Sequence, residues 1–320
     1  MKNTTPIDHN IFEELEARIG REHLSKRLRR QVSYSAFRFT GGIKIYWENF
    51  YFCHVILKFL LTVSGMLNRG QRNALDYKIE EQRVPVKNLP DAFENFRILH
   101  LSDIHVDAII DKGERLRLIL KDIRFDLCVI TGDFRFRTFG DYESTVRGME
   151  ALVPALKCKH GIIGIIGNHD FIEIVPHLES LGIKILLNEA VPVELNGEAI
   201  WVAGVDDAYF YEVHNLTKAF RDVPENVFKV LLSHSPEIIY QAAQCGTDYY
   251  LCGHTHGGQI CLPGGTPLIT NSKCSRKFAT GRWQCNGMSG YTSRGTGASG
   301  IPVRFFCPPE LAVHVLEREA

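Results

Sequence analysis

Five short apolar runs of the chain each end in side chains that can bind a metal ion. The runs, with the residues that follow each, are 97–101 with Asp103 and His105, 127–131 with Asp133, 161–166 with Asn168 and His169, 229–233 with His234, and 249–252 with His254 and His256. Amphipathic segments at 112–122, 142–156 and 171–181 alternate with such runs, as strands and helices do in an α/β fold. Open α/β sheets place their sites at the carboxyl ends of strands. The pattern therefore predicts an α/β body, from about residue 89 to 320, with one site at its strand ends.

The residue types indicate which metals this site would take. Imidazole and carboxylate ligands without thiolate suit Mn²⁺, Fe²⁺ or Zn²⁺. The seven candidate ligands are Asp103, His105, Asp133, Asn168, His234, His254 and His256. Seven are too many for one ion, and a bridging carboxylate, most simply Asp133, would let them serve two. Two divalent ions ~3.5–4 Å apart can clamp a phosphoryl group and generate hydroxide at neutral pH, so the pattern predicts metal-dependent phosphoryl chemistry.

Each motif alone has a structural explanation, since a single strand-end histidine such as His234 is usually a core or surface residue. Their joint occurrence in order argues against that explanation. Asp103-x-His105, Gly132-Asp133, Gly167-Asn168-His169-Asp170, His234 and Gly253-His254-x-His256 resemble the motifs of calcineurin-like metallophosphoesterases, over roughly residues 95–317. The resemblance implies a four-layer sandwich of two mixed β-sheets flanked by helices. Asp170 departs from the glutamate that is commoner after that histidine.

The same resemblance implies how the ligands divide between two ions. It assigns one metal to Asp103, His105, Asp133 and His256, and the second to Asp133, Asn168, His234 and His254. It implies that His169 is not a ligand and sits over the substrate as an acid or phosphate-contacting donor. We expect Mn²⁺ to restore activity best.

Segments after the last histidine motif resemble a narrower, bacterial subfamily with a membrane-associating N-terminus. They are 257–260, 291–295 and 307–310. That subfamily includes phosphodiesterases and UDP-2,3-diacylglucosamine pyrophosphatases, which implies a lipid-linked phosphodiester or pyrophosphate, such as a lipid A precursor, as substrate. His169 argues against the lipid-A-pathway branch that carries arginine there. The alternative is a soluble phosphodiesterase or phosphatase acting on nucleotides or other small phosphate esters. A non-catalytic scaffold is disfavoured, because all seven ligands and His169 are present.

For residues 1–88 the sequence predicts a separate, basic, amphipathic helical module. Residues 21–80 carry eleven Lys and Arg against four Asp and Glu, although the whole chain has a formal net charge of zero. No whole-molecule field therefore favours nucleic acid. Residues 10–30 have helical periodicity, and Gly41-Gly42 ends that segment.

The most apolar stretch, 43–67, carries a narrow polar stripe of His54, Lys58 and Thr62. A transmembrane helix is disfavoured, because Lys58 would lie in mid-span. A helix in the membrane interface fits the wide apolar face and the basic residues Lys26, Arg27, Arg29 and Arg30. A helix packed on the body or on a second subunit of a homodimer also fits.

Nine cysteines without a C-x-x-C pair indicate reduced thiols, and the first thirty residues lack a signal peptide. We therefore expect a cytoplasmic protein, peripheral on the inner face of the membrane if the helix binds it. Arg135, Arg137 and Arg294 lie near the motifs, where each either contacts a second phosphate or belongs to a solvated loop.

Overall fold

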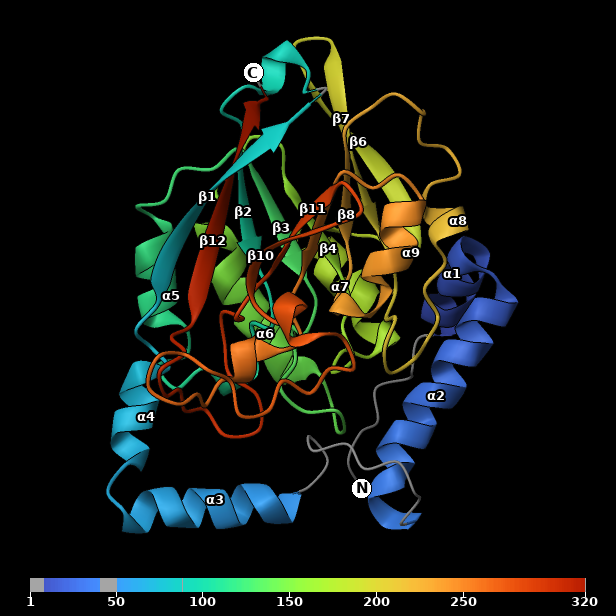
Figure 1. The fold of residues 1–320 in the computed structure, drawn as a ribbon. Coiled ribbons are helices and arrows are strands. Elements are labelled where there is room, and N and C mark those ends of the chain that lie inside the picture. Colours follow the sequence, from blue (N-terminus) through green and yellow to red (C-terminus); the bar gives the residue numbers. More distant parts are fainter. Residues whose placement is uncertain (1–8, 41–50, 88, 320) are drawn as a thin grey trace.

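The fold is two mixed six-stranded sheets packed face to face between helices (Figure 1). It is seen in a computed structural model that describes residues 9–40, 51–87 and 89–319. The helices are α1 His9–Ile19, α2 Arg21–Thr40, α3 Tyr51–Val63, α4 Leu67–Asn73, α5 Glu114–Leu120, α6 Glu143–Leu152, α7 Val175–Ser180, α8 Leu216–Ala219 and α9 Ile239–Gln244. The strands are β1 Lys78–Val86, β2 Arg97–Leu101, β3 Leu127–Thr131, β4 Ile162–Ile165, β5 Ile183–Ile185, β6 Glu189–Leu195, β7 Glu198–Gly204, β8 Lys229–Leu232, β9 Tyr249–Cys252, β10 Gly281–Cys285, β11 Met288–Thr292 and β12 Glu310–Arg318.

Strand order places the predicted motifs at the centre of each sheet. One sheet has the order β1-β12-β2-β3-β4-β5, and the other has the order β10-β11-β9-β8-β7-β6. β2, β3 and β4 are parallel neighbours, as are β7, β8 and β9. The carboxyl ends of the five motif-bearing strands therefore meet at one edge of the sandwich.

Alternating side chains divide the apolar residues into three layers, because successive residues of a strand point to opposite faces. Ile98 and Val129 lie in the core between the sheets together with Val202 and Val230. Leu99 and its equivalents pack outward under α5, α6 and α7, and the outer face of the second sheet packs under α8 and α9. The predicted four-layer α/β sandwich is confirmed.

One strand of the first sheet, β1, precedes the predicted boundary at residue 88. β1 lies within the segment assigned to the helical module, yet it pairs in parallel with β12 along its whole length, from Lys78 with Glu310 to Val86 with Arg318. β1 carries several charges and Pro85, as edge strands commonly do, so its apolar alternation is weak. Residues 78–86 are therefore part of the same sheet as the motif-bearing strands β2, β3 and β4.

Helix α2 docks on the body, on the side of β6 and α8 (Figure 1). Leu15, Ile19 and Leu24 of α1 and α2 join the core outside the first sheet. Arg27 is completely buried and lies 3.1 Å from Asp206, while Arg30 pairs with Glu212. Arg27 is therefore unavailable to a bilayer, contrary to its expected place in a membrane-facing basic cluster, and Arg30 is already paired.

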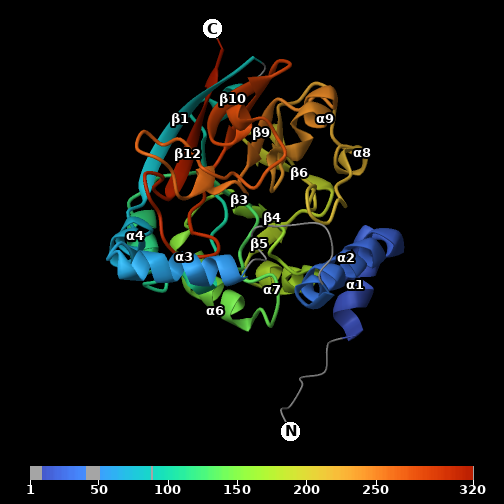
Figure 2. The ribbon, with the colours of Figure 1, turned by 60° about the horizontal axis from the view of Figure 1, so that its bottom comes forward.

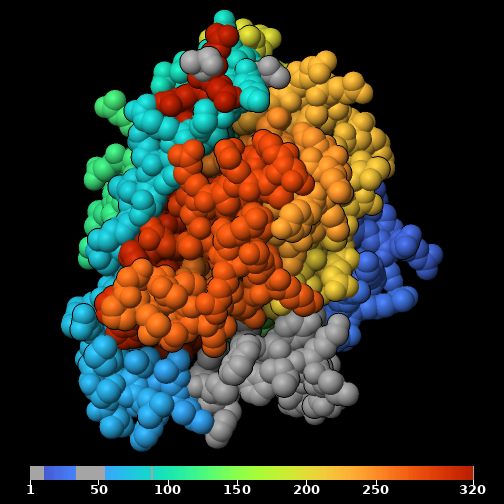
Figure 3. All heavy atoms as spheres, viewed as in Figure 1, coloured from blue at the N-terminus to red at the C-terminus, as the bar shows by residue number. Residues whose placement is uncertain are grey.

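Helix α3 lies at the end of the molecule that carries α4 and α6 (Figure 2). Leu57 and Leu61 pack against Ile301, Val303 and Phe305, so one narrow side of the helix is covered. Phe59, Leu60 and Val63 are 64%, 56% and 71% exposed. The light-blue atoms of α3 and α4 project from the lower left of the body (Figure 3). Gly41-Gly42 and the side chain of His54 lie outside what the structure describes.

Within residues 9–40, 51–87 and 89–319, no helix combines the length and the apolar character that a membrane span requires.

Candidate metal centre

Six of the eight predicted site residues provide ligand atoms that gather in one buried cluster. Among the described residues, three groups of ligand atoms lie within 4.8 Å of one another: Asp103 with His105 and His256, His105 with Asp133 and His169, and Asp103 with Asp133 and His234. The groups share Asp103, His105 and Asp133, so they form one continuous site. The other two predicted residues, Asn168 and His254, contact its rim through His234.

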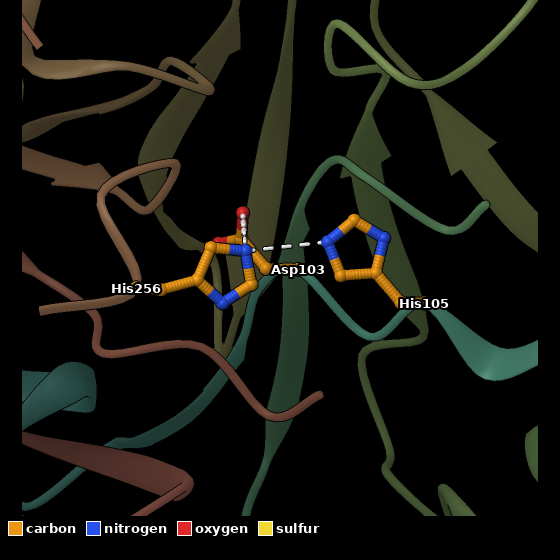
Figure 4. A group of neighbouring side chains, drawn as sticks. All are labelled: Asp103, His105 and His256. Atoms are coloured by element: carbon orange, nitrogen blue, oxygen red, sulfur yellow. Dashed lines mark hydrogen bonds and ion pairs between the residues drawn. The ribbon is translucent and has the colours of Figure 1, made fainter. Parts of the chain in front are cut away.

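Asp103, His105 and His256 make the first part of the cluster (Figure 4). Nε2 of His256 lies 3.4 Å from Oδ1 of Asp103 and 3.2 Å from Nε2 of His105. The two imidazole rings are stacked, with centroids 5.2 Å apart. Two ring nitrogens and a carboxylate oxygen thus face one small volume, as the ligands of a single ion do.

Asp133 lies between this group and the second one. Its Oδ2 is 3.4 Å from Nε2 of His234, 3.8 Å from Nε2 of His169 and 3.9 Å from Nε2 of His105. Nε2 of His234 also donates to Oδ1 of Asn168 at 2.8 Å. A single carboxylate with imidazoles on several sides is placed to bridge two ions.

The far nitrogen of three rings is held by a backbone carbonyl. Nδ1 of His234 donates to Thr131, Nδ1 of His169 donates to Phe136 at 2.7 Å, and Nδ1 of His105 donates to Arg135. Such bonds fix the ring orientation and leave Nε2 to face the cluster, which is the usual outer support of metal-binding histidines. The donor set therefore fits divalent metal ions.

His254 is oriented differently. Its Nε2 donates to the carbonyl of Asn271 at 3.0 Å, and its ring meets that of His234 edge on, with centroids 5.1 Å apart. Nδ1 is consequently the His254 nitrogen that remains for a metal.

Burial and neighbouring charges set the protonation states of the cluster residues. Burial lowers the pKa of His105 and, with help from His105 and Arg304, that of His256, so both imidazoles are neutral. Burial alone would raise the pKa of Asp133, but His234 and His169 hold it well below its ordinary value. Asp133 in turn raises the pKa of His234 against the effect of burial.

Five of the candidate ligands have left-handed backbone conformations. Their φ angles are +49° at Asp103, +45° at His105, +56° at Asp133, +70° at His254 and +50° at His256. A non-glycine residue in this region costs about 1–2 kcal/mol, and such residues cluster at functional sites. The sharp turns aim several side chains into one volume, and no periodicity in the sequence reports them.

Asp170 is a supporting residue whose role the sequence did not reveal. It is fully buried, and its carboxylate accepts from the backbone N–H groups of Asp133 (2.8 Å), Gly167 (2.9 Å) and Arg135 (3.0 Å). It thereby ties the loop after β4 to the loop after β3. A Cβ at Gly167 would collide with Asp133 and His234, so only glycine permits this approach.

Two arginines near the motifs have structural roles. The guanidinium of Arg135 is buried against the Phe171 ring and donates to carbonyls at 139, 140 and 141. Arg294 pairs with Glu80 and Glu310. Of the two roles that the sequence left open, a contact with a second phosphate is therefore not supported for Arg135 or Arg294. Arg137, in contrast, is exposed.

Comparison with known proteins agrees with this geometry. Residues 96–258 match the family model of the calcineurin-like phosphoesterases. The chain is 30% identical over 265 residues to the metallophosphoesterase YkoQ of Bacillus subtilis, covering 80% of this chain and 96% of that protein. It is 28% identical over 283 residues to a transmembrane protein with metallophosphoesterase domain from Danio rerio, covering 82% of this chain and 62% of that protein. Among solved structures, the NAD nucleotidase of Haemophilus influenzae aligns with a TM-score of 0.41 and 17% identity, over 69% of this chain and 50% of that one.

The fold and the buried cluster together define a metal-dependent phosphoesterase. The chain belongs to the calcineurin-like phosphoesterase family. The family implies a dinuclear divalent-metal centre, and the cluster supplies candidate ligands for it.

Proposed function

We propose that the protein hydrolyses a phosphodiester or pyrophosphate bond of a lipid-linked substrate, with UDP-diacylglucosamine-type lipids as the leading class. One ion would be held by Asp103, His105, Asp133 and His256, and the other by Asp133, Asn168, His234 and His254. The observation that carries the hydrolytic part is the position of Asp133, whose carboxylate has imidazole nitrogens of three histidines within 3.9 Å.

Two divalent ions, when bound, would neutralise the phosphate and supply a hydroxide nucleophile at neutral pH. The protein's own contribution is positioning and proton transfer. With Nδ1 donating to the carbonyl of Phe136, protonated His169 would present an Nε2–H toward the cluster. It is thus placed to give a proton to the leaving oxygen.

A cavity beside the cluster supports the substrate part of the proposal. It has a volume of about 640 Å³ and is lined by Val55 and Lys58 of α3, by Leu67 of α4 and by the loop from Phe136 to Asp141. Phe136 joins the cavity to the metal centre, since its ring meets that of His105 edge on and its carbonyl accepts from His169. The lining also includes the acids Asp107 and Asp141. The cations Lys58 and Arg137 lie beside the apolar side chains of Val55 and Leu67, which suits a phosphorylated amphiphile.

The exposed side of α3 supports a location at a membrane. Ile56, Phe59, Leu60 and Val63 form one apolar surface, which we call the outer face of α3. An apolar helix face beside the substrate cavity would let a lipid pass from the bilayer surface to the site. Peripheral binding to an anionic cytoplasmic leaflet follows from this proposal.

A substrate panel with metal add-back tests the proposal. Protein stripped with a chelator should be inactive and should recover best with Mn²⁺. It should then hydrolyse a UDP-diacylglucosamine lipid with a higher kcat/KM than an aryl phosphodiester or a free nucleotide. Lys58→Ala should raise KM for the lipid alone, while Lys121→Ala, which does not line this cavity, should not. Equal or greater turnover of free nucleotides would favour the soluble phosphodiesterase, and full activity without metal would refute the metal chemistry.

A further inference from the structure

Arg27 of helix α2 reaches the loop that carries Asn168 and His169. Its guanidinium is completely buried and donates to the carbonyl of Asp170 at 2.8 Å and to that of Gly167 at 3.5 Å. Its Nη1 lies 3.1 Å from Oδ1 of Asp206, which is also fully buried. A charged group from the N-terminal extension thus contacts the backbone on both sides of two predicted site residues.

Tyr211 completes this contact. Its ring lies under the guanidinium of Arg27, 3.6 Å from the ring centroid to Cζ, and its hydroxyl donates to the carbonyl of Asn168 at 2.9 Å. The carbonyls at 167, 168 and 170 consequently all accept hydrogen bonds from Arg27 or from Tyr211 beside it.

One turn further along α2, the side chain of Gln31 forms hydrogen bonds with the next part of the same loop. Its Oε1 accepts from the N–H of Ile172 at 3.1 Å, and its Nε2 donates to Glu173 at 2.8 Å. The Asp170 carboxylate holds the opposite side of the loop through three N–H groups. The loop is therefore fixed between the body and α2.

Attachment of α2 does not by itself require a buried arginine. Apolar residues of similar volume often replace a buried ion pair without loss of stability. An apolar side chain cannot, however, hold two peptide carbonyls in a set direction. The orientation of the peptides at 167–170 determines where the side chains of Asn168 and His169 point. Oδ1 of Asn168 lies 2.8 Å from Nε2 of His234, and Nε2 of His169 lies 3.8 Å from Oδ2 of Asp133.

We propose that Arg27 is a positioning residue of the active site and that Tyr211 acts with it. α2 is then a wall of the catalytic site as well as a part of the extension, and the chain is fully active only when α2 is docked. The proposal rests on the proposed function for its kinetic part, but its metal-binding part stands on the candidate ligands alone.

The main experiment uses the full chain and two variants that keep the fold. Tyr211→Phe removes the hydroxyl and retains the ring. Arg27→Met with Asp206→Asn removes both charges, so that no unpaired charge stays buried. Arg30→Met is the matched control, because Arg30 lies on the same helix in an exposed pair with Glu212. Free Mn²⁺ is followed by electron paramagnetic resonance during titration, and kcat and KM are measured with an aryl phosphodiester.

We expect Tyr211→Phe to weaken binding of one Mn²⁺ and to lower kcat by roughly tenfold, with KM changed less than twofold, since outer supports of metal ligands typically contribute 10–100-fold. The double variant should show the same pattern with a larger loss, and the control should match the parent. Parental Mn²⁺ affinity and kcat in Tyr211→Phe, with only a lower melting temperature in the double variant, would overturn the proposal. If the parent binds two Mn²⁺ but hydrolyses no phosphoester, the proposed function fails, and the Mn²⁺ titration still decides the role of Arg27.

Discussion

Helices α2 and α3 belong to the same N-terminal extension but meet the rest of the protein in opposite ways. α2 is polar, yet it buries Arg27 and Gln31 against the catalytic loop. α3 is apolar, yet it leaves Phe59, Leu60 and Val63 largely exposed. Hydropathy alone would have assigned the greater burial to α3.

Hydropathy indicates how much free energy a helix gains from burial, but it says little about which surface of the protein the helix contacts. α2 finds its partner through directed bonds to peptide carbonyls, which an apolar side chain cannot make. α3 covers only the side of Leu57 and Leu61, and its outer face fits a partner beyond the body. We therefore propose that α2 is part of the catalytic unit, and the proposed membrane contact would fall on the outer face of α3.

The largest expected loss of activity follows from a change in the metal centre itself, and the effects of changes in α2 and α3 can be compared with it. Asp133→Asn removes the carboxylate that faces three histidines, and with it the charge that would offset two bound ions. We expect a loss of several kcal/mol of transition-state stabilisation, or roughly 10³-fold in kcat, together with loss of bound metal. Elemental analysis and kinetics of the purified variant measure both.

His169→Ala should differ from Asp133→Asn in its effect on bound metal. It should keep two metals per chain while kcat falls by about 10²-fold, as expected for loss of a general acid. His169 could also serve as a ligand, because its Nε2 groups with Asp133 and His105. An empty centre in His169→Ala would show that it is a ligand and would refute its assignment as an acid.

The comparison also shows what the sequence could and could not predict. The runs 97–101, 127–131 and 249–252 were predicted with the bounds that the structure gives, because central strands are buried on both faces and read as continuous apolar runs. β1, β6 and β10 were missed, and all three are edge strands with polar alternation. β11 was missed as a short strand with a central glycine.

For the site, the sequence identified side chains by type and order but not their supports. All eight predicted residues lie at or beside the cluster, because each follows a strand end that topology brings to one edge. Whether each is a ligand in the predicted set stays a prediction. The supporting roles of Arg27 and Asp170 could not be recognised, because most of their partners are backbone groups distant in the sequence, and no side-chain pattern encodes such partners.

The next largest effect concerns the buried pair beneath α2. Burial alone would raise the pKa of Asp206, but Arg27 and His23 outweigh it and lower that pKa. A lowered folded-state pKa means that the pair stabilises the protein above the unfolded pKa of about 4 and loses that contribution as pH falls through the folded value. Asp206→Asn should therefore cost about 3 kcal/mol of unfolding free energy at pH 7.

Urea unfolding of the parent and Asp206→Asn at several pH values measures this contribution. The difference between the two proteins should shrink as the pH falls below about 4. A difference that grows below that pH would contradict the assigned direction.

The outer face of α3 gives a smaller effect, confined to membrane binding. Leu60→Glu places a charge on a side chain that is 56% exposed, so folding and turnover of a soluble aryl phosphodiester should barely change. Loss of one inserted leucine, about 1.5–3 kcal/mol, should weaken binding to anionic vesicles at least tenfold in flotation assays. High salt should weaken it further.

Leu57→Glu is the matched control, three residues away on the covered side of the same helix. It should destabilise the protein, because it buries a carboxylate against Ile301 and Val303. If Leu60→Glu unfolded the protein or changed its oligomeric state without any vesicle binding in the parent, α3 would be an internal or dimer contact instead.

The smallest expected effect separates the buried and exposed charges of α2. Arg30 lies three residues after Arg27 and pairs with Glu212 at 2.6 Å, but the two side chains are 35% and 48% exposed. Water already solvates such charges well, and exposed pairs contribute roughly 0–1 kcal/mol to stability. Arg30→Met should therefore shift the unfolding free energy by less than about 0.5 kcal/mol and leave kcat unchanged, as measured by urea unfolding and steady-state kinetics. A loss as large as that of the Arg27 variant would mean that α2 is held by its total charge, and the distinction between directed carbonyl contacts and general attraction would fail. Agreement with the parent would assign the effect of Arg27 to its burial beside the catalytic loop.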